Sequence, residues 1–187
     1  MYIQTFTGKK FDIENPRVED VDIIDIAHGL ANQCRFNGQC KRFYSVAEHS
    51  LLMSLLIDNE YAQYDIPRYA LLHDASEAYT GDMITQLKNS EHMNGFREIE
   101  KNLQATIYES FRLSPHQPEI ISLLDRALLY KEAEQMMYDV TAWEGWEEQK
   151  SRGVDIIFTP YFLAPQDAES SFLRQFNDLF NKKSRIF

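Results

Sequence analysis

His73 and Asp74 place an imidazole and a carboxylate on adjacent residues of an apolar stretch. If this stretch is helical, Glu77 shares roughly one face with them, because it follows His73 by four residues and Asp74 by three. Gly81 is then expected to end the helix, with Asp82 directly behind it. Ionisable groups are costly to bury inside an apolar run unless something compensates them, and a metal ion is one candidate. The ordinary alternative is a helix end that carries solvated acids.

Two more ionisable residues fall among apolar residues elsewhere in the chain. His49 follows the pattern Ser45-Val46-Ala47-Glu48, a capping box in which Ser45 caps a helix and Glu48 reaches back to it. Asp125 lies within a predicted helix, where an acid is either solvated on the exposed face or directed inward. Two imidazoles and two carboxylates from different helices would form a metal site with coordination places left for water or substrate. The candidate ligands are His49, His73, Asp74 and Asp125.

Candidate groups for a phosphate lie before this set and within it in the sequence. Arg35 and Phe36 come just before the turn signal Asn37-Gly38, so Arg35 is expected at the end of a helix. Its ordinary role there is to satisfy the last carbonyls, and the functional alternative is to hold a phosphate with its planar guanidinium. Lys88 lies in the segment 82–95, which is predicted to be a long loop of the kind that often acts as a lid. Four further cations could serve a longer polyphosphate: Lys9, Lys10, Lys41 and Arg42.

The elements that must position these groups are predicted to be helices. Apolar periodicity, caps and breaks at Pro or Gly indicate helices over about 21–34, 45–59, 68–79, 96–111, 119–138 and 166–181, with a polar loop over 59–67. The alternation from Met1 to Thr7, followed by a turn, indicates a short strand or an extended arm. In the helix over 119–138 the side chains expected to be buried are Ile120, Ile121, Leu123, Leu124, Ala127 and Leu128. The predicted fold class is therefore all-α, in one domain.

Composition limits the function further. The chain has 187 residues, 44% of them hydrophobic and 13% aromatic, which is enough for one packed domain. Its net charge of −10 argues against a protein that coats DNA or RNA, since phosphate backbones bind basic faces. There is no apolar run of membrane-spanning length and no leader, so we expect no membrane partner and a cytoplasmic location, or the host cytoplasm if a phage encodes the protein. Cys34 and Cys40 are expected to be free thiols, because their spacing fits neither a zinc nor a redox motif.

Taken together, these motifs resemble those of HD-domain phosphohydrolases. The matching segments are Cys34-Arg35-Phe36, Tyr44-Ser45-Val46-Ala47-Glu48-His49-Ser50, Leu72-His73-Asp74-Ala75-Ser76-Glu77-Ala78-Tyr79-Thr80-Gly81-Asp82, and Asp125 with the later Glu132-Ala133. Within that superfamily the chain is similar to the small group that contains bacterial 5′-deoxynucleotidases and phage deoxynucleoside triphosphohydrolases acting on dATP. The resemblance covers roughly residues 20–140. It implies a helical bundle of the HD-domain type, one domain over 1–187, with 141–187 as a C-terminal helical extension.

The resemblance also implies a role for each candidate residue. One divalent transition metal would be held by His49, His73, Asp74 and Asp125. Glu77 would be the general acid or base, and Asp82 would position or polarise the reacting groups. Arg35 would hold the phosphate, Lys88 would add a second phosphate contact, and Phe36 would contact the nucleoside. The remaining histidines, His28, His92 and His116, have no matching place in two-metal relatives, so a single metal is expected. This ligand set suits zinc, cobalt, manganese, iron or nickel, and a magnesium ion could accompany a substrate polyphosphate.

The function expected from these roles is hydrolysis of deoxynucleotides, of dATP or a related mono-, di- or triphosphate, by a metal-activated water. One alternative is a 5′-deoxynucleotidase restricted to monophosphates. Others are a nucleotide-sensing HD domain that binds without turnover, against which the intact Glu77 and Asp82 argue, and a plain helical interaction protein. The resemblance implies a homo-oligomer, a dimer or hexamer, and the sequence leaves the base preference and the metal open.

Overall fold

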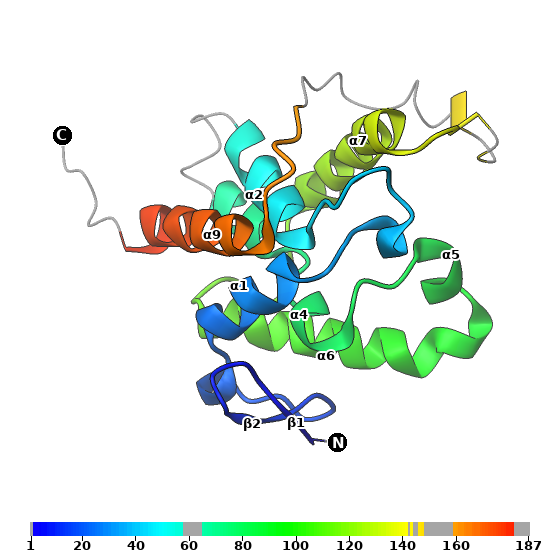
Figure 1. Ribbon diagram of the computed structural model, residues 1–187. Coiled ribbons are helices and arrows are strands. Elements are labelled where there is room, and N and C mark those ends of the chain that lie inside the picture. The colour runs from blue at the N-terminus through cyan, green and yellow to red at the C-terminus, as the bar shows by residue number, and fades with distance from the viewer. Residues whose placement is uncertain (1, 58–64, 142, 144–145, 148–158, 182–187) are drawn as a thin grey trace.

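Helices form most of the part of the chain that the computed structural model describes, which is residues 2–57, 65–141, 143, 146–147 and 159–181 (Figure 1). The helices are α1 (Ile23–Ala31), α2 (Val46–Leu56), α3 (Ile66–Leu72), α4 (Glu77–Thr80), α5 (Thr85–Lys88), α6 (Asn94–Ser110), α7 (Glu119–Met136) and α9 (Pro165–Phe180), with the 3-10 turns η1 (Val18–Asp20), η2 (Phe36–Gly38) and η4 (Glu91–Met93) between them. This confirms the predicted all-α fold class. None of the helices in these ranges has the length and apolar character needed to cross a bilayer.

The N-terminal segment is a small antiparallel hairpin of β1 (Tyr2–Gln4) and β2 (Lys10–Asp12), with Ile3 opposite Phe11. The predicted short strand and the turn after it are therefore confirmed. Phe11 is fully buried and stacks on Tyr79 of α4, with ring centroids 4.2 Å apart and ring planes 12° from parallel. This stacking fixes the hairpin to the short helix that also carries Glu77, at the end of the molecule away from α7 (Figure 1).

The predicted helix over 68–79 is interrupted between α3 and α4. Residues 73–76 form turns, and Gln104 of α6 bridges them. Its Nε2 donates to the carbonyl of Leu72 at 2.7 Å, and its Oε1 accepts from the backbone N–H of Ser76 at 2.9 Å. A continuous helix was the wrong prediction because a side chain 28 residues later satisfies these backbone groups, which frees the chain to turn.

The helix α4 is short, and its position depends on two glycines. Gly81 ends it as predicted, in a left-handed conformation with φ of +86° that glycine adopts without a steric cost. On the other side, α4 packs against α1 at Gly29. A Cβ atom at Gly29 would lie 2.8 Å from the carbonyl oxygen and 2.9 Å from the Cβ of Ala78. The two helices approach this closely because Gly29 has no side chain.

Three other predictions about local structure are wrong. The segment 82–95 contains α5 and η4 rather than a plain loop, and Arg97 holds it by donating to the carbonyls of Lys88 and Ser90.

A second wrong prediction concerns Leu123 on α7, whose side chain is 50% exposed. The rest of the predicted buried face is confirmed in part: Ile121, Ala127 and Leu128 are buried, and Ile120 and Leu124 are partly buried. α2 ends at Leu56, and Ile57 is extended, so the predicted end near residue 59 was too late. Most of the predicted loop 59–67 lies outside the described residues. Cys34 and Cys40 are free thiols, as expected.

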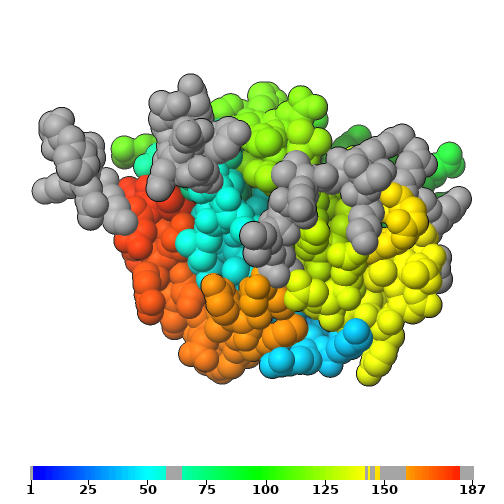
Figure 2. Space-filling model, turned by 90° about the horizontal axis from the view of Figure 1, so that it is seen from above, coloured from blue at the N-terminus to red at the C-terminus, as the bar shows by residue number. Residues whose placement is uncertain are grey.

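The capping box at the start of α2 is half correct. Ser45 Oγ accepts from the backbone N–H of Glu48 at 3.1 Å, as predicted. Glu48, however, does not reach back to Ser45. Its buried carboxylate accepts from the backbone N–H groups of Tyr161, Phe162 and Leu163 at 2.7, 2.9 and 2.8 Å. These bonds tie the segment before α9 to α2, against which it lies in Figure 2.

The last helix completes the core around α2. α9 packs on α1, α2 and α3 (Figure 1). The buried face of α9 includes Ala168, Phe172 and Phe176, which lie in the same hydrophobic cluster as the apolar side chains of those helices. The predicted helix over 166–181 is confirmed within one residue at each end. α2 is therefore enclosed, which explains why its His49 is fully buried.

Because α1 and α4 lie in close contact at Gly29, a single methyl group added there is expected to destabilise the fold. We expect Gly29→Ala to lower the free energy of unfolding by about 1–3 kcal/mol, because the added Cβ overlaps the Ala78 backbone. Gly95→Ala in α6 is the matched control, since a Cβ there meets nothing within 4 Å and should be neutral or stabilise by up to about 1 kcal/mol. Urea unfolding of both variants measures the difference, and equal stability would show that the two helices move apart freely.

Candidate metal centre

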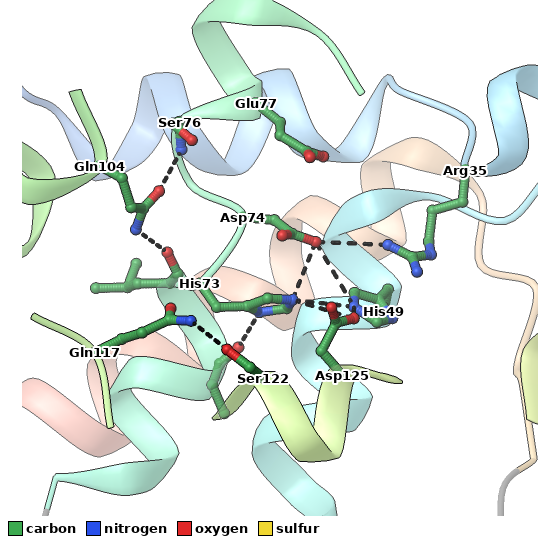
Figure 3. Close-up of polar contacts among 12 residues, drawn as sticks. Arg35, His49, His73, Asp74, Ser76, Glu77, Gln104, Gln117, Ser122 and Asp125 are labelled. Carbon is green, nitrogen blue, oxygen red and sulfur yellow. Dashed lines mark hydrogen bonds and ion pairs between the residues drawn. The ribbon is translucent and has the colours of Figure 1, made fainter. Parts of the chain in front are cut away.

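Four candidate ligands from three elements converge on one point. His49 comes from α2, His73 and Asp74 from the turn after α3, and Asp125 from α7. The Nε2 atoms of His49 and His73 lie 3.1 Å apart, and Asp74 Oδ2 is 3.1 Å from His73 Nε2 and 3.7 Å from His49 Nε2. Asp125 Oδ1 approaches the same two nitrogens at 3.2 Å and 3.8 Å from another side (Figure 3). The structure thus brings together all four residues named from the sequence.

Asp125 is the most accessible of these four residues. Its side chain is 41% exposed, whereas those of His49 and His73 are 0% and 5% exposed. The sequence left open whether this acid is solvated or directed inward, and the structure has both features: the carboxylate reaches the imidazoles from the solvent side. An open approach beside Asp125 is the geometry that leaves coordination places for water or substrate.

The two imidazoles present lone pairs to the same space. His73 Nδ1 lies 2.8 Å from the carbonyl of Ala70, which only accepts, so His73 donates through Nδ1. His49 Nδ1 lies 2.6 Å from Glu132 Oε1 and donates to that carboxylate. In a neutral imidazole the other nitrogen is then an acceptor, so two acceptors stand 3.1 Å apart beside two carboxylates. A divalent cation with nitrogen and oxygen ligands fits this set of donors, and His49, His73, Asp74 and Asp125 would hold it.

The electrostatics of the histidines point the same way. Burial lowers the pKa of His73, but the carboxylates of Asp74 and Asp125 outweigh this and raise its pKa well above the usual range. Burial and Arg35 lower the pKa of His49, but Glu132 and Asp125 outweigh both and raise this pKa above its usual value. The surroundings therefore favour a positive charge at the paired Nε2 atoms. A bound metal ion supplies that charge in place of a proton.

Glu132 organises the buried side of the centre. Its carboxylate is fully buried on α7 and accepts from the Tyr44 hydroxyl at 2.8 Å and from His49 Nδ1 through Oε1. Its Oε2 accepts from Arg35 Nε at 3.2 Å and lies 3.0 Å from Arg35 Nη2. Burial raises the pKa of Glu132, but Arg35 and His49 outweigh it and hold this pKa below its usual value. One carboxylate thus orients a candidate metal ligand and the candidate phosphate-binding arginine together.

The candidate substrate-binding residues line one cavity beside the centre. Arg35 Nη1 lies 3.5 Å from Asp74 Oδ2, which places the guanidinium against a candidate metal ligand. The cavity has a volume of about 630 Å³, and Arg35, Phe36, Asp74, Glu77, Asp82, Lys88 and Asp125 are among the residues that line it. It also contains the aromatic side chains of Tyr130, Trp143 and Trp146. Every candidate site residue except the two buried histidines therefore borders this cavity.

Glu77 has the properties of a group that handles protons. It is 7% exposed, and within the described part of the chain its Oε2 is buried and accepts no hydrogen bond. Burial and the neighbouring carboxylates of Asp74 and Asp82 raise the pKa of Glu77 well above its usual range. Lys88 Nζ is 3.7 Å from Glu77 Oε1 but closer to Glu100 Oε1, at 2.7 Å. A buried carboxyl group with a raised pKa and an oxygen that makes no hydrogen bond within the described residues is suited to giving or taking a proton.

Several residues that shape the site were not identified from the sequence. Gln33 donates through Nε2 to the carbonyl of Glu77 at 2.8 Å and accepts from the backbone N–H of Asp82 at 2.9 Å, so it holds both ends of α4. Glu132 was noticed only as part of a motif, with no role. Neutral Gln33 and Gln104 carry no pattern that distinguishes them from ordinary helix residues. Of the cations considered for a polyphosphate, Lys9, Lys10, Lys41 and Arg42 are not among the residues that line this cavity.

Comparison with known proteins agrees with the helical fold and the candidate metal centre described above. The sequence profile of the family described as "HD domain" matches residues 30–151 of this chain. The chain is 34% identical to the uncharacterized protein YfdR of Escherichia coli (strain K12) over 178 residues, which covers 95% of each protein. It is 42% identical to an uncharacterized protein of Rhodobacter capsulatus over 113 residues, or 57% of this chain and 56% of that protein.

The contacts of Glu132 predict its effect on metal affinity. We expect Glu132→Ala to weaken the binding of Zn²⁺ or Co²⁺ by about 10–100-fold, because His49 loses the acceptor that fixes its tautomer and ring orientation. Competition with a coloured chelator measures the affinity, and circular dichroism checks that the variant is folded. Glu119→Ala, an exposed change on the same helix, is the control and should bind metal as the wild type does. Unchanged affinity in Glu132→Ala would remove Glu132 from the support of the centre.

Proposed function

The chain belongs to the HD domain family and is therefore a metal-dependent phosphohydrolase, and from this premise we propose that it hydrolyses phosphate esters of deoxynucleotides. The single observation that carries the proposal is the continuity of the site. The metal-ligand cluster, the buried Glu77, the Arg35 guanidinium and an aromatic cavity adjoin one another. One molecule with a phosphate at the cluster and a ring system in the cavity would contact all of them.

The cavity beside the cluster supports a nucleoside. Its volume of about 630 Å³ lies within the range of roughly 300–1,000 Å³ common for small-molecule sites. The rings of Phe36 and Trp143 lie 6.4 Å apart by centroid, and those of Tyr130 and Trp146 lie 5.1 Å apart. Aromatic surfaces of this kind accept the flat face of a base, and Arg35 at the inner end matches a phosphate. This arrangement supports the role proposed for Phe36 as a nucleoside contact.

Each residue then has a distinct part in the proposed reaction. When bound, the divalent metal polarises a phosphoryl oxygen and lowers the pKa of a water molecule. Arg35 binds the phosphoryl oxygens and is itself held between Asp74 and Glu132. Glu77 takes a proton from the attacking water or gives one to the leaving oxygen through its free Oε2. Asp82, on the cavity wall, positions the reacting groups, and its burial raises its pKa.

A nucleotide panel tests this function directly. The metal-loaded protein is incubated with deoxy- and ribonucleoside mono-, di- and triphosphates, and the products are separated by chromatography. We expect hydrolysis of deoxynucleotides with release of a nucleoside or nucleotide, and no hydrolysis by Asp74→Ala, which loses a metal ligand. If no member of the panel is hydrolysed with any of the candidate metals, the proposed function is wrong.

The role of Glu77 is tested by separating metal binding from turnover. Glu77→Gln should keep the wild-type metal content, because Glu77 is not among the ligands, and should lower kcat by roughly two to four decades. Glu98→Gln, an exposed carboxylate of α6, is the matched control and should leave kcat unchanged. Metal content by mass spectrometry and initial rates on one substrate measure both properties. Full turnover in Glu77→Gln would exclude it as the acid or base.

A further inference from the structure

The two cysteines of the chain lie beside each other on the turn that carries Arg35 and Phe36. Cys34 and Cys40 are six positions apart in the sequence, and their Sγ atoms are 3.5 Å apart in the structure. Both are free thiols, and both side chains are partly exposed. A disulfide has an S–S distance of about 2.05 Å, so the two sulfur atoms would have to approach by about 1.5 Å to form one.

The backbone of this turn explains why the two cysteines meet. Phe36, Asn37 and Gly38 all have left-handed conformations, with φ of +56°, +51° and +74°. Three such residues in succession reverse the chain and bring Cys40 back beside Cys34. Phe36 and Asn37 have a Cβ atom, which makes this conformation unfavourable, so the surrounding structure must hold the turn in place.

The turn is anchored to the rest of the fold at both ends. At its start, the backbone N–H of Arg35 donates to the carbonyl of Tyr44 at 2.9 Å. At its end, the backbone N–H of Lys41 donates to the carbonyl of Met136, the last residue of α7, at 2.8 Å. Because both ends are held, closing the gap between the sulfur atoms has to move the backbone between them, which carries two candidate site residues.

The two sulfur atoms have different surroundings. Cys40 Sγ donates to the carbonyl of Arg42 at 2.9 Å, and the carbonyl of Arg35 lies 3.7 Å from it. Burial raises the pKa of Cys40 to about 11, and the neighbouring Cys34 adds to the rise. Cys40 is therefore a thiol at neutral pH, whereas the form of a cysteine that attacks an oxidant is the thiolate. This difference assigns the first reaction with an oxidant to Cys34 and the second step to Cys40.

We propose that Cys34 and Cys40 form a redox modification site, at which hydrogen peroxide converts the two thiols into a disulfide that weakens phosphate binding by Arg35. The Cys34 sulfur attacks one peroxide oxygen, the O–O bond breaks, and the thiol proton leaves with the displaced hydroxide as water, which gives a sulfenic acid. The Cys40 sulfur then attacks the Cys34 sulfur, the S–O bond breaks, and the second hydroxide leaves as water with the Cys40 proton. The two thiols together lose two electrons, which reduce the peroxide to water.

The disulfide is expected to weaken phosphate binding because Arg35 is held closely from other elements. Its guanidinium reaches from the turn to Asp74, with Nη1 3.5 Å from Oδ2, and to Glu132, with Nη2 3.0 Å from Oε2 (Figure 3 shows the first contact). A displacement of about 1 Å in a site can cost roughly 100-fold in activity. None of the four candidate metal ligands lies in the turn, so metal binding should not change. This consequence rests on the role proposed for Arg35, whereas formation of the disulfide does not.

Thiol counting tests the modification site without relying on turnover. The reduced full chain is treated with hydrogen peroxide and denatured, and its free thiols are titrated. We expect both thiols to disappear together, with loss of the mass of two hydrogens and with a peptide that links Cys34 to Cys40. Cys40→Ser should stop at a Cys34 sulfenic acid that dimedone traps, and Cys34→Ser should keep its thiol at the same peroxide dose. Cross-links between chains, or loss of one thiol only in the wild type, would overturn the proposal.

Calorimetry with inorganic phosphate tests the consequence for the site. We expect the oxidised, metal-loaded full chain to bind phosphate about tenfold more weakly than the reduced chain, and dithiothreitol to restore the affinity. Metal content and the helical circular dichroism signal should stay the same, which separates this effect from unfolding. Cys34→Ser is the matched control, since the same peroxide treatment should leave its phosphate affinity unchanged. Equal affinity of the reduced and the oxidised wild type would contradict the proposed effect of the disulfide.

The outcomes separate the modification site from the proposed function. A disulfide that weakens phosphate binding, in a protein that hydrolyses no member of the nucleotide panel, would support the modification site and overturn the function. Hydrolysis of nucleotides by a wild-type protein whose two thiols survive the peroxide would overturn the modification site and leave the function standing.

Discussion

The structure depends on two imidazole nitrogens that are held 3.1 Å apart with their lone pairs toward the same space. Each ring is locked from behind, His49 by the buried Glu132 and His73 by the carbonyl of Ala70. Without a positive charge between them, two acceptors and two nearby carboxylates repel one another. A cation bound between them would relieve this repulsion, and the helical core keeps the four candidate ligands from moving apart.

The fold supplies that rigidity through long-range polar contacts as well as apolar packing. Gln104 and Gln33 clamp the two ends of the segment that carries His73, Asp74 and Glu77. Glu48 ties the chain before α9 onto α2, directly beside His49. Each of these side chains satisfies backbone groups at a helix end or a turn, where they would otherwise lack partners. The segment that carries His73, Asp74 and Glu77 thus lies where one helix ends and another begins, and side chains from other elements fix its geometry.

The sequence was sufficient for the fold class and for naming four candidate ligands that the structure brings together, because His73-Asp74 and His49 lie in motifs and Asp125 lies among apolar residues at helical spacing. It was not sufficient for the break between α3 and α4, since the cause is Gln104, which is distant in sequence and has no distinguishing pattern. For the same reason Glu48 was assigned to a local cap when its partners are 113–115 residues away. The role of Glu132 also depends on which helices meet, and local periodicity does not contain that information.

X-ray absorption spectroscopy of the protein, purified with one of the candidate metals, tests the central claim most directly, because it counts the atoms around the ion. The account predicts about one metal per chain with nitrogen and oxygen neighbours at about 2.0–2.2 Å, the scattering pattern of two imidazoles, and no sulfur, since neither cysteine is a proposed ligand. Protein that holds no metal, or a first shell with a single imidazole or with sulfur, would contradict it.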